Sequence, residues 1–332
     1  MRAQLERQLN CLWYSHSPLA KLLWPLSLPF LLLSLLRRKF LLFRSSQKLP
    51  VPVIVVGNIT VGGSGKTPLV LAVSQYLARR GLRVGVISRG YGGAAEYPLR
   101  VLASTPAAES GDEPLLMARR GLAPLVVSPD RLAAAALVLE EKVDLIVSDD
   151  GLQHYRLPRD IEIVVVDGER GLGNGLSLPV GPLRESGGRL ASVDLVVANG
   201  NLQQPLRQGC HVMLLQPGEL LSVLPDSSRE APHAGERVHA VAAIGNPERF
   251  FHTLQQLGFE VIRHPFPDHH PFTESELLFP DGLPVVMTEK DAVKCGSFAG
   301  LSRHWYLPVE AVLPEAFWLA LQQKLDTIRQ EK

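Results

Sequence analysis

The stretch GNITVGGSGKTP, residues 57–68, follows an apolar run at 51–56 and precedes a run of helix-forming residues at 69–80, which Gly81 ends. The apolar run is typical of a buried parallel strand, and the later run is typical of a helix. A strand, a glycine-rich turn and a helix N-terminus in this order surround an anion with backbone N–H groups and the positive end of the helix dipole. The sequence therefore predicts a phosphate-binding loop (P-loop) at this turn.

The residues of this loop have separate expected roles. Lys66 would reach the β- and γ-phosphates, and the Thr67 hydroxyl would ligate Mg²⁺. Thr60 stands where the usual pattern has glycine, but Gly62 and Gly63 still allow positive φ angles. The alternative is a glycine-rich turn without a ligand. The expected nucleotide-binding residues are Thr60, Val61, Gly62, Gly63, Ser64, Gly65, Lys66 and Thr67.

Length and composition indicate a globular protein with a substantial core. The chain has 332 residues, of which 46% are hydrophobic and 20% charged, enough for one large or two modest domains and an appendage. The net charge of +1 gives no general attraction to nucleic acid. Cys11, Cys210 and Cys295 lie far apart without metal-ligand spacing, so we expect reduced thiols in a cytosolic setting.

Residues 1–48 differ from the rest and predict a hydrophobic membrane anchor. Residues 22–36 carry no charge, although Pro25 and Pro29 interrupt them. A helix of this length would measure about 22 Å, against about 30 Å for the hydrocarbon core, so a short span and an interfacial insertion both remain open. Basic residues follow and would hold this flank at the cytoplasmic leaflet: Arg37, Arg38, Lys39, Arg44 and Lys48. The alternatives are a cleaved signal peptide, which the basic cluster disfavours, and a buried core helix.

From residue 49 onward, strand and helix patterns alternate, which predicts an α/β fold. Residues 49–203 would form a P-loop core domain with a parallel sheet, closed by a strand at 194–198. Residues 204–237 are polar and rich in Pro, Gly and Ser, and are typical of a linker. Residues 238–332 would form a second, smaller Rossmann-like α/β domain.

An apolar strand at 143–148 ends in Asp149 and Asp150. Carboxylates at the end of a strand downstream of a P-loop are typical ligands of Mg²⁺, which prefers oxygen. The alternative is a pair of turn residues. Gly151, Leu152, Gln153 and His154 follow directly, so we expect His154 near the phosphates, although a lone histidine is more often structural.

Further candidates lie in loops. Arg89 begins the glycine-rich turn RGYGG after a strand, where open α/β sheets bind ligands, although a flexible loop has the same pattern. Arg170 and Arg184 lie in a long loop and are candidate anion clamps or surface charges. Asp112 precedes a helix and could be its N-cap.

Two segments invite comparison with other kinds of site. His269 and His270 are adjacent, and adjacent residues of an extended segment point to opposite faces, so we do not expect them to share a metal ion. The segment TEKD at 288–291 is similar to the guanine-reading pattern N/T-K-x-D. Its lysine is one position late, so it predicts no GTP specificity.

Seven motifs occur in a fixed order after the hydrophobic N-terminus: GNITVGGSGKTP, SRGYGG, GDEP, SDDGLQH, LPVGPLRE, FPDHHPF and TEKDAVK. In this set, which spans nearly the whole chain, the sequence resembles the tetraacyldisaccharide 4′-kinases, the lipid A 4′-kinases of Gram-negative bacteria. Thr60 in place of the first glycine is the form that this family shows. The ordered set is far more specific than any single motif.

The resemblance implies an inner-membrane enzyme that faces the cytoplasm, with an ATP site between two Rossmann-like domains. It would phosphorylate the 4′-hydroxyl of a lipid A disaccharide 1-phosphate precursor. By resemblance, Lys66 and Thr67 bind phosphate and Mg²⁺, Asp149 or Asp150 completes the metal shell, and Asp112 and His269 are the proposed catalytic pair, with Lys66 also catalytic. Substrate-binding candidates are Arg89, Gln153, His154 and Arg184.

The expected cofactors are ATP and Mg²⁺, and the expected partners are the lipid disaccharide and the inner membrane surface, with no nucleic acid and no obligate protein partner. A multiply acylated lipid stays in the bilayer, at about 0.8 kcal/mol per buried CH₂, so its kinase must dock there. Two other functions remain open. One is a regulatory P-loop ATPase or GTPase, whose signature lysine near the loop's start is replaced here by Thr60-Val61. The other is a membrane-attached nucleotide-binding scaffold.

Overall fold

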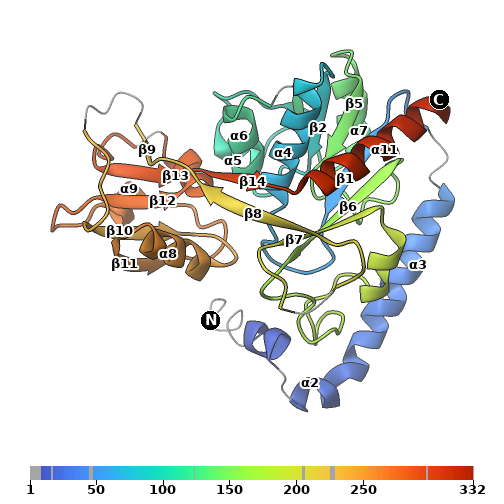
Figure 1. Ribbon diagram of the computed structural model, residues 1–332, viewed down its shortest axis with the longest axis horizontal. Helices are drawn as coiled ribbons and strands as arrows, with labels where there is room; N and C mark the ends of the chain where they lie inside the picture. Colours follow the sequence, from blue (N-terminus) through green and yellow to red (C-terminus); the bar gives the residue numbers. More distant parts are fainter. Residues whose placement is uncertain are drawn as a thin grey trace.

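A nine-stranded, mostly parallel sheet forms the centre of the larger part of the molecule, which we call the large body (Figure 1). The computed structural model describes residues 9–15, 18–44, 48–122, 124–203, 206–224, 229–296 and 298–331. The strands from β8 to β4 are parallel, and the edge strands β14 and β3 are antiparallel to their neighbours. In spatial order they are β14 (Val309–Val312), β8 (His211–Pro217), β7 (Leu195–Asn199), β6 (Ile161–Asp167), β1 (Val53–Gly57), β5 (Leu145–Ser148), β2 (Val84–Ser88), β4 (Leu125–Val127) and β3 (Leu99–Arg100).

The central strands are buried along their whole length because both faces of the sheet are covered. One face packs against α4 (Lys66–Arg79), α6 (Asp112–Arg119) and α11 (Glu315–Glu331). The other packs against α7 (Arg131–Leu139) and against the loop that contains the 3₁₀ helix η2 (Gly187–Ser192). The short helix α5 (Ala107–Ser110) comes directly before α6.

A five-stranded sheet forms the centre of the small body. Its strands, in spatial order, are β11 (Glu260–Pro265), β10 (Arg237–Ala242), β12 (Val285–Thr288), β13 (His304–Leu307) and β9 (Leu221–Ser222). One face packs against α8 (Pro247–Gln256), and the other against the layer of α9 (Glu274–Leu277), α10 (Glu289–Ala292) and η3 (Val293–Cys295). The expected α/β fold with a second, smaller α/β unit is confirmed.

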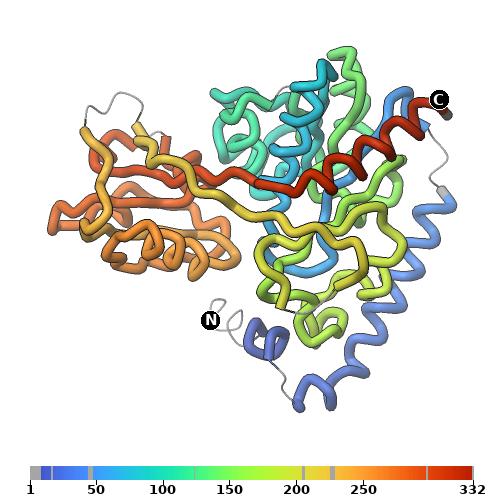
Figure 2. The backbone as a smooth tube through the Cα atoms, in the orientation of Figure 1, coloured from blue at the N-terminus to red at the C-terminus, as the bar shows by residue number. Residues whose placement is uncertain are grey.

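The chain passes twice between the two bodies, at β8 to β9 and at β13 to β14 (Figure 2). This arrangement differs from the sequence-based division. The strand at the end of the first domain is not its last, because β8, in the expected linker, pairs with β7. The last elements of the expected C-terminal domain, β14 and α11, belong to the large body. We therefore propose that the core domain includes β8, β14 and α11, and that the second domain runs from β9 to β13.

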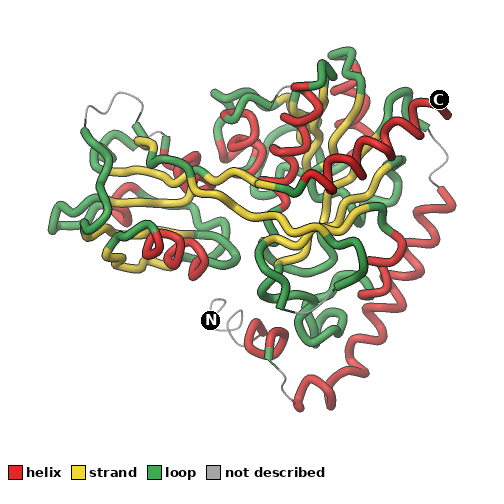
Figure 3. The backbone as a smooth tube through the Cα atoms, in the orientation of Figure 1, coloured by secondary structure: helices red, strands yellow, loops and turns green. Residues whose placement is uncertain are grey.

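The N-terminal segment lies along the side of the large body as α2 (Pro18–Leu23), η1 (Trp24–Ser27) and α3 (Leu28–Arg44), beside loop-rich structure (Figure 3). Ser27 Oγ donates to the carbonyl of Ser177 at 2.6 Å, and Ser34 Oγ to that of Arg184 at 3.3 Å. In the described part of the chain, one stretch, Pro18–Phe43, is long and apolar enough to cross a membrane, with a mean hydropathy of 1.8. Only 11% of its most apolar window is buried, so the alternative of a buried core helix is wrong.

Parts of the expected anchor and linker lie outside the residues that the structure describes. Residues 1–8, 16, 17 and 45–47 of the anchor lie outside the described residues, as do 204, 205 and 225–228 of the expected linker.

Candidate functional site

The P-loop joins β1 to α4 as the sequence predicts. Gly65 is the N-cap residue of α4 with φ 89°, and Gly62 has φ 103°, so both occupy the left-handed region that favours glycine. A Cβ at Gly65 would also lie 2.3 Å from Nδ2 of Asn199, which donates to the carbonyl of Ser64. Glycine is therefore required there both by backbone angle and by space.

Thr60, the residue that departs from the usual motif, has a structural role at the loop's start. It is buried and forms an antiparallel bridge with Leu183, while the N–H of Val61 donates to the carbonyl of Pro182 at 2.9 Å. The loop that carries Arg184 is thereby attached to the P-loop. Because Thr60 pairs with Leu183 in this bridge, a residue with a side chain fits where the usual motif has glycine.

Lys66 and Arg184 converge on one carboxylate. Oδ1 of Asp150 lies 3.5 Å from Lys66 Nζ and 3.6 Å from Arg184 Nη1. Burial alone would raise the pKa of Asp150, but the charges of Lys66 and Arg184 lower it. The structure thus brings together the P-loop lysine, one acidic residue after β5 and one of the two expected anion clamps.

Asp149, the neighbouring carboxylate, is almost completely buried. Ser88 Oγ donates to its Oδ2 at 3.1 Å, whereas its Oδ1 has no hydrogen-bond partner among the described residues. Burial and the negative charges of Glu113 and Asp150 raise the pKa of Asp149 to about 7. An unsatisfied buried carboxylate oxygen in such surroundings suits a hard divalent cation.

A metal site made by protein side chains alone is absent from the described residues, where three or more His, Cys, Asp or Glu side chains nowhere form a suitable group. Mg²⁺ does not require one, because it usually binds one or two carboxylates together with phosphates and water. The residues present therefore fit Mg²⁺ bound with a nucleotide.

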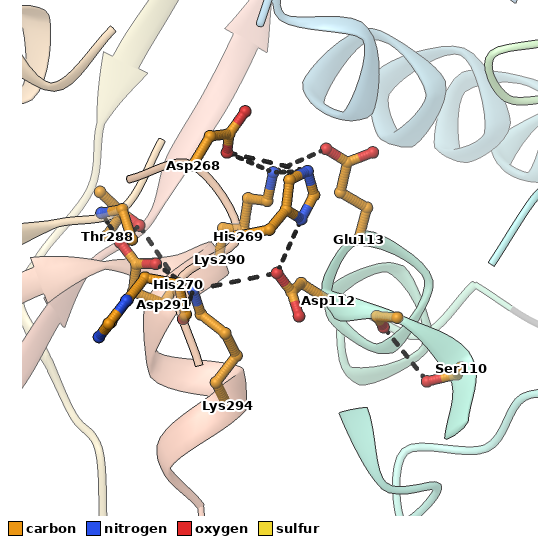
Figure 4. Close-up of polar contacts among 12 residues, drawn as sticks. Ser110, Asp112, Glu113, Asp268, His269, His270, Thr288, Lys290, Asp291 and Lys294 are labelled. Carbon is orange, nitrogen blue, oxygen red and sulfur yellow. Dashed lines mark hydrogen bonds and ion pairs between the residues drawn. The ribbon is translucent and has the colours of Figure 1, made fainter. Parts of the chain in front are cut away.

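Asp112 and His269 meet across the two bodies, 3.1 Å apart between Oδ2 and Nδ1 (Figure 4). His269 has φ 60° in the loop after β11 and comes from the small body. Asp112 is the first residue of α6 and comes from the large body. Its interpretation as the helix N-cap is wrong: the N-cap is Gly111, at φ 87°, a residue without a side chain that could cap the helix. The carboxylate of Asp112 is directed instead to the imidazole.

Lys290 continues this contact on the other side of the ring. Its Nζ lies 3.3 Å from His269 Nε2, 3.0 Å from Glu113 Oε1 and 3.4 Å from Asp268 Oδ1. Because an ammonium group only donates, His269 Nε2 accepts and Nδ1 carries the proton that is donated to Asp112. Burial would lower the pKa of Lys290, but Glu113 and Asp268 raise it.

Glu113 connects this group to the P-loop. Burial would raise the pKa of its carboxyl, but the charges of Lys290 and Lys66 lower it. Lys294 stands nearby, 2.7 Å from Asp291 and 3.9 Å from Asp112. The acid–histidine pair and the phosphate loop therefore belong to one electrostatic site.

The remaining candidates surround this site less directly. Gln153 Nε2 donates to the carbonyl of Asn58 and to Glu185, so it supports the loop after β1. Burial, with the charges of Arg131 and Arg89, lowers the pKa of His154 to about 4, so this imidazole is neutral at physiological pH.

Arg170 and His270 have partners of their own. Arg170 Nη1 donates to the carbonyl of Gly245 at 3.2 Å, which joins the two bodies beside the P-loop. His270 Nε2 contacts Glu276, whereas His269 contacts Asp112.

Sequence reasoning missed four charged residues of the site: Glu113, Asp268, Lys290 and Lys294. Glu113 and Asp268 lie next to the selected residues Asp112 and His269, in the motifs GDEP and FPDHHPF, whereas Lys290 and Lys294 lie in the motif TEKDAVK. Opposite charges in motifs of two different domains were the available signal. The acid of the TEKD segment, Asp291, accepts from Thr288 and from the N–H of Ala243, so it is engaged within the small body.

Comparisons with known proteins agree on one family. A family model described as tetraacyldisaccharide-1-P 4′-kinase matches residues 19–326. The tetraacyldisaccharide 4′-kinase of Alkalilimnicola ehrlichii is 58% identical over 80% of this chain and 79% of its own, and that of Pseudomonas aeruginosa is 49% identical over 94% and 95%. The crystal structure of LpxK from Aquifex aeolicus in complex with ATP superposes with a TM-score of 0.72 at 28% identity, over 92% of this chain and 99% of its own.

Proposed function

Because the chain belongs to the tetraacyldisaccharide-1-P 4′-kinase family, we propose that Asp112 and His269 take the proton from the sugar hydroxyl that attacks ATP. The chain is an ATP-dependent kinase that transfers phosphate to the 4′-hydroxyl of a tetraacyldisaccharide 1-phosphate in lipid A biosynthesis. A regulatory ATPase and a nucleotide-binding scaffold are not favoured.

The hydroxyl of a sugar is a weak nucleophile, so a positioned base accelerates its attack. In the tautomer that Lys290 imposes, His269 donates its Nδ1–H to Asp112. The carboxylate of Asp112 then has the lone pairs that can accept the hydroxyl proton, and His269 orients it. The observation that carries this proposal is the 3.1 Å contact across the two bodies, beside Glu113 and Lys66.

Phosphoryl transfer depends mainly on positioning and charge stabilisation. Lys66 and the N-terminus of α4 would face the phosphates, and Arg184 lies within reach of the same carboxylate as Lys66. These groups would stabilise the negative charge of the transferred phosphoryl group. Asp149, Asp150 and Thr67 would hold Mg²⁺, which neutralises phosphate charge when bound.

The N-terminal segment would bring this site to the inner membrane surface, at its cytoplasmic face. Leucines and phenylalanines are exposed along it, among them Leu22, Leu33 and Phe43 at 75%, 66% and 90%. Ser34 of α3 donates to the carbonyl of Arg184, so α3 contacts the loop that carries this candidate anion clamp. A lipid held in the bilayer would thus find its sugar close to the P-loop.

The test is transfer of radiolabelled γ-phosphate from ATP to a tetraacyldisaccharide 1-phosphate in detergent micelles. Wild-type protein should label the lipid, and His269→Ala should lower kcat by at least about 10². Full turnover in folded His269→Ala protein would remove the pair from the mechanism.

A further inference from the structure

A further ion pair crosses between the two bodies, besides the contacts of His269 with Asp112 and of Lys290 with Glu113. Arg120, the C-cap residue of α6, places Nε 2.5 Å and Nη2 2.8 Å from the two carboxylate oxygens of Glu289, the first residue of α10. The side chains are 23% and 13% exposed. This two-bond geometry between a planar guanidinium and a carboxylate fixes direction as well as distance.

With this pair, α10 has two attachments to α6. Glu289 holds the C-terminal end of α6 through Arg120, and its neighbour Lys290 holds the N-terminal turn through Glu113. Arg120 Nη2 also lies 3.4 Å from the carbonyl of Val309, where the chain crosses from β13 to β14. Two contacts at opposite ends of one helix prevent the small body from rotating about either contact alone.

The position of His269 depends on that orientation. Its loop is attached to the small body, where the N–H of His269 donates to the carbonyl of Ala243 at 3.3 Å. Asp112 is fixed to the large body by α6. A small rotation between the bodies therefore changes the distance between Asp112 and His269 directly.

We propose that Arg120 and Glu289 form a positioning pair that holds His269 against Asp112 for proton transfer. The proposal rests on the proposed function of Asp112 and His269. Neither Arg120 nor Glu289 touches the reacting atoms. Their effect is to keep the catalytic contact formed in the closed arrangement of the two bodies, because a displacement of 1 Å at a reacting centre can cost about 10²-fold in rate.

The experiment measures kcat, KM for lipid and ATP affinity in Arg120→Gln and Glu289→Gln, each alone and in a His269→Ala background. The swapped variant Arg120→Glu/Glu289→Arg tests rescue. Arg237→Gln is the matched control, since Arg237 also binds a glutamate, Glu260 at 3.1 Å, but within the small body. Melting temperatures verify folding in every variant.

We expect Arg120→Gln and Glu289→Gln to lower kcat about tenfold with unchanged ATP affinity, and the swapped variant to recover most of it. In the His269→Ala background the same substitutions should change kcat less than about twofold, because the contact they position is already lost. Arg237→Gln should match wild type. A kcat within about twofold of wild type in both single variants overturns the proposal. So does a tenfold fall in kcat that is just as large when the substitutions are made in the His269→Ala background.

Failure of the proposed function has a different signature, namely His269→Ala at wild-type kcat. The positioning pair is then measured by hydrogen exchange in residues 266–272, which should accelerate several-fold in Arg120→Gln and not in Arg237→Gln. Unchanged exchange in that segment would overturn the pair as a positioning device.

Discussion

Replacing Asp112 by Asn removes the proposed base with almost no structural change. Asn has the same size, and its amide oxygen can still accept the Nδ1–H of His269 over the 3.1 Å contact. Gly111 caps α6, so the helix loses no cap, and Lys294 keeps its closer partner Asp291 at 2.7 Å. We expect kcat to fall by about 10² or more, equivalent to about 2.7 kcal/mol of activation free energy.

The assay follows labelled lipid at saturating ATP, with melting temperature and ATP affinity measured in parallel. The melting temperature should change by less than about 3 °C, since no cap or close ion pair is lost. Glu109→Gln, an acid-to-amide change at an exposed residue of α5, is the matched control and should keep wild-type kcat. Wild-type kcat in Asp112→Asn would refute the reasoning and transfer the role of base to another residue, with His154 the next candidate.

Three further predictions concern the P-loop, the membrane segment and pH. Lys66→Ala should abolish lipid phosphorylation in a folded protein, because a preorganised charge at the phosphates is lost; near-normal turnover would contradict the P-loop assignment. The triple change Leu22→Asn, Leu33→Asn and Phe43→Asn should reduce recovery with membranes and raise KM for lipid in bilayers, while activity in detergent is retained; unchanged sedimentation with vesicles would argue against this surface. Burial lowers the pKa of His264 and of His304, so the unfolded state binds more protons below about pH 6.5 and the small body loses stability as pH falls. Hydrogen exchange in β10 to β12, corrected for intrinsic rates, should therefore accelerate from pH 7 to 5.5, and slower exchange would refute the sign.

Local features of the fold were predictable because neighbouring residues determine them. The P-loop needs only a buried strand, a glycine-rich turn and a helix start, and all three lie within residues 51–80. The strand before Asp149 and Asp150 is similarly local. The sequence also indicated a second α/β unit after a polar segment, but not its limits, because β8 lies within that segment and pairs with β7.

Long-range pairing was not predictable in the same way. β14 pairs with β8 in antiparallel register across about a hundred residues, and no local pattern distinguishes an edge strand of one sheet from that of another. The apolar face of α11 fits either body by periodicity alone. In the structure, Phe317 and Leu321 enter the core of the large body, and this determines where the helix belongs.

In the site, too, local features were predictable and long-range contacts were not. Asp112 and His269 lie 157 residues apart, and only the resemblance to a family indicated that they meet. Aspartate at the start of a helix is typical of an N-cap, but Gly111 occupies that position and leaves the carboxylate available to His269. Lys290 was considered only as part of a guanine-reading pattern, because its contacts with Glu113 and Asp268 require the folded arrangement of both bodies.

The central claim is that this chain transfers phosphate from ATP, bound at the P-loop, to a lipid disaccharide whose hydroxyl is deprotonated by Asp112 and His269. Its most direct test is the position of the label after wild-type protein is incubated with γ-labelled ATP, Mg²⁺ and a tetraacyldisaccharide 1-phosphate. The label should appear in the lipid on the 4′-oxygen, in amounts equal to the ADP formed. Inorganic phosphate formed at the same rate with and without lipid, and no labelled lipid, would contradict it.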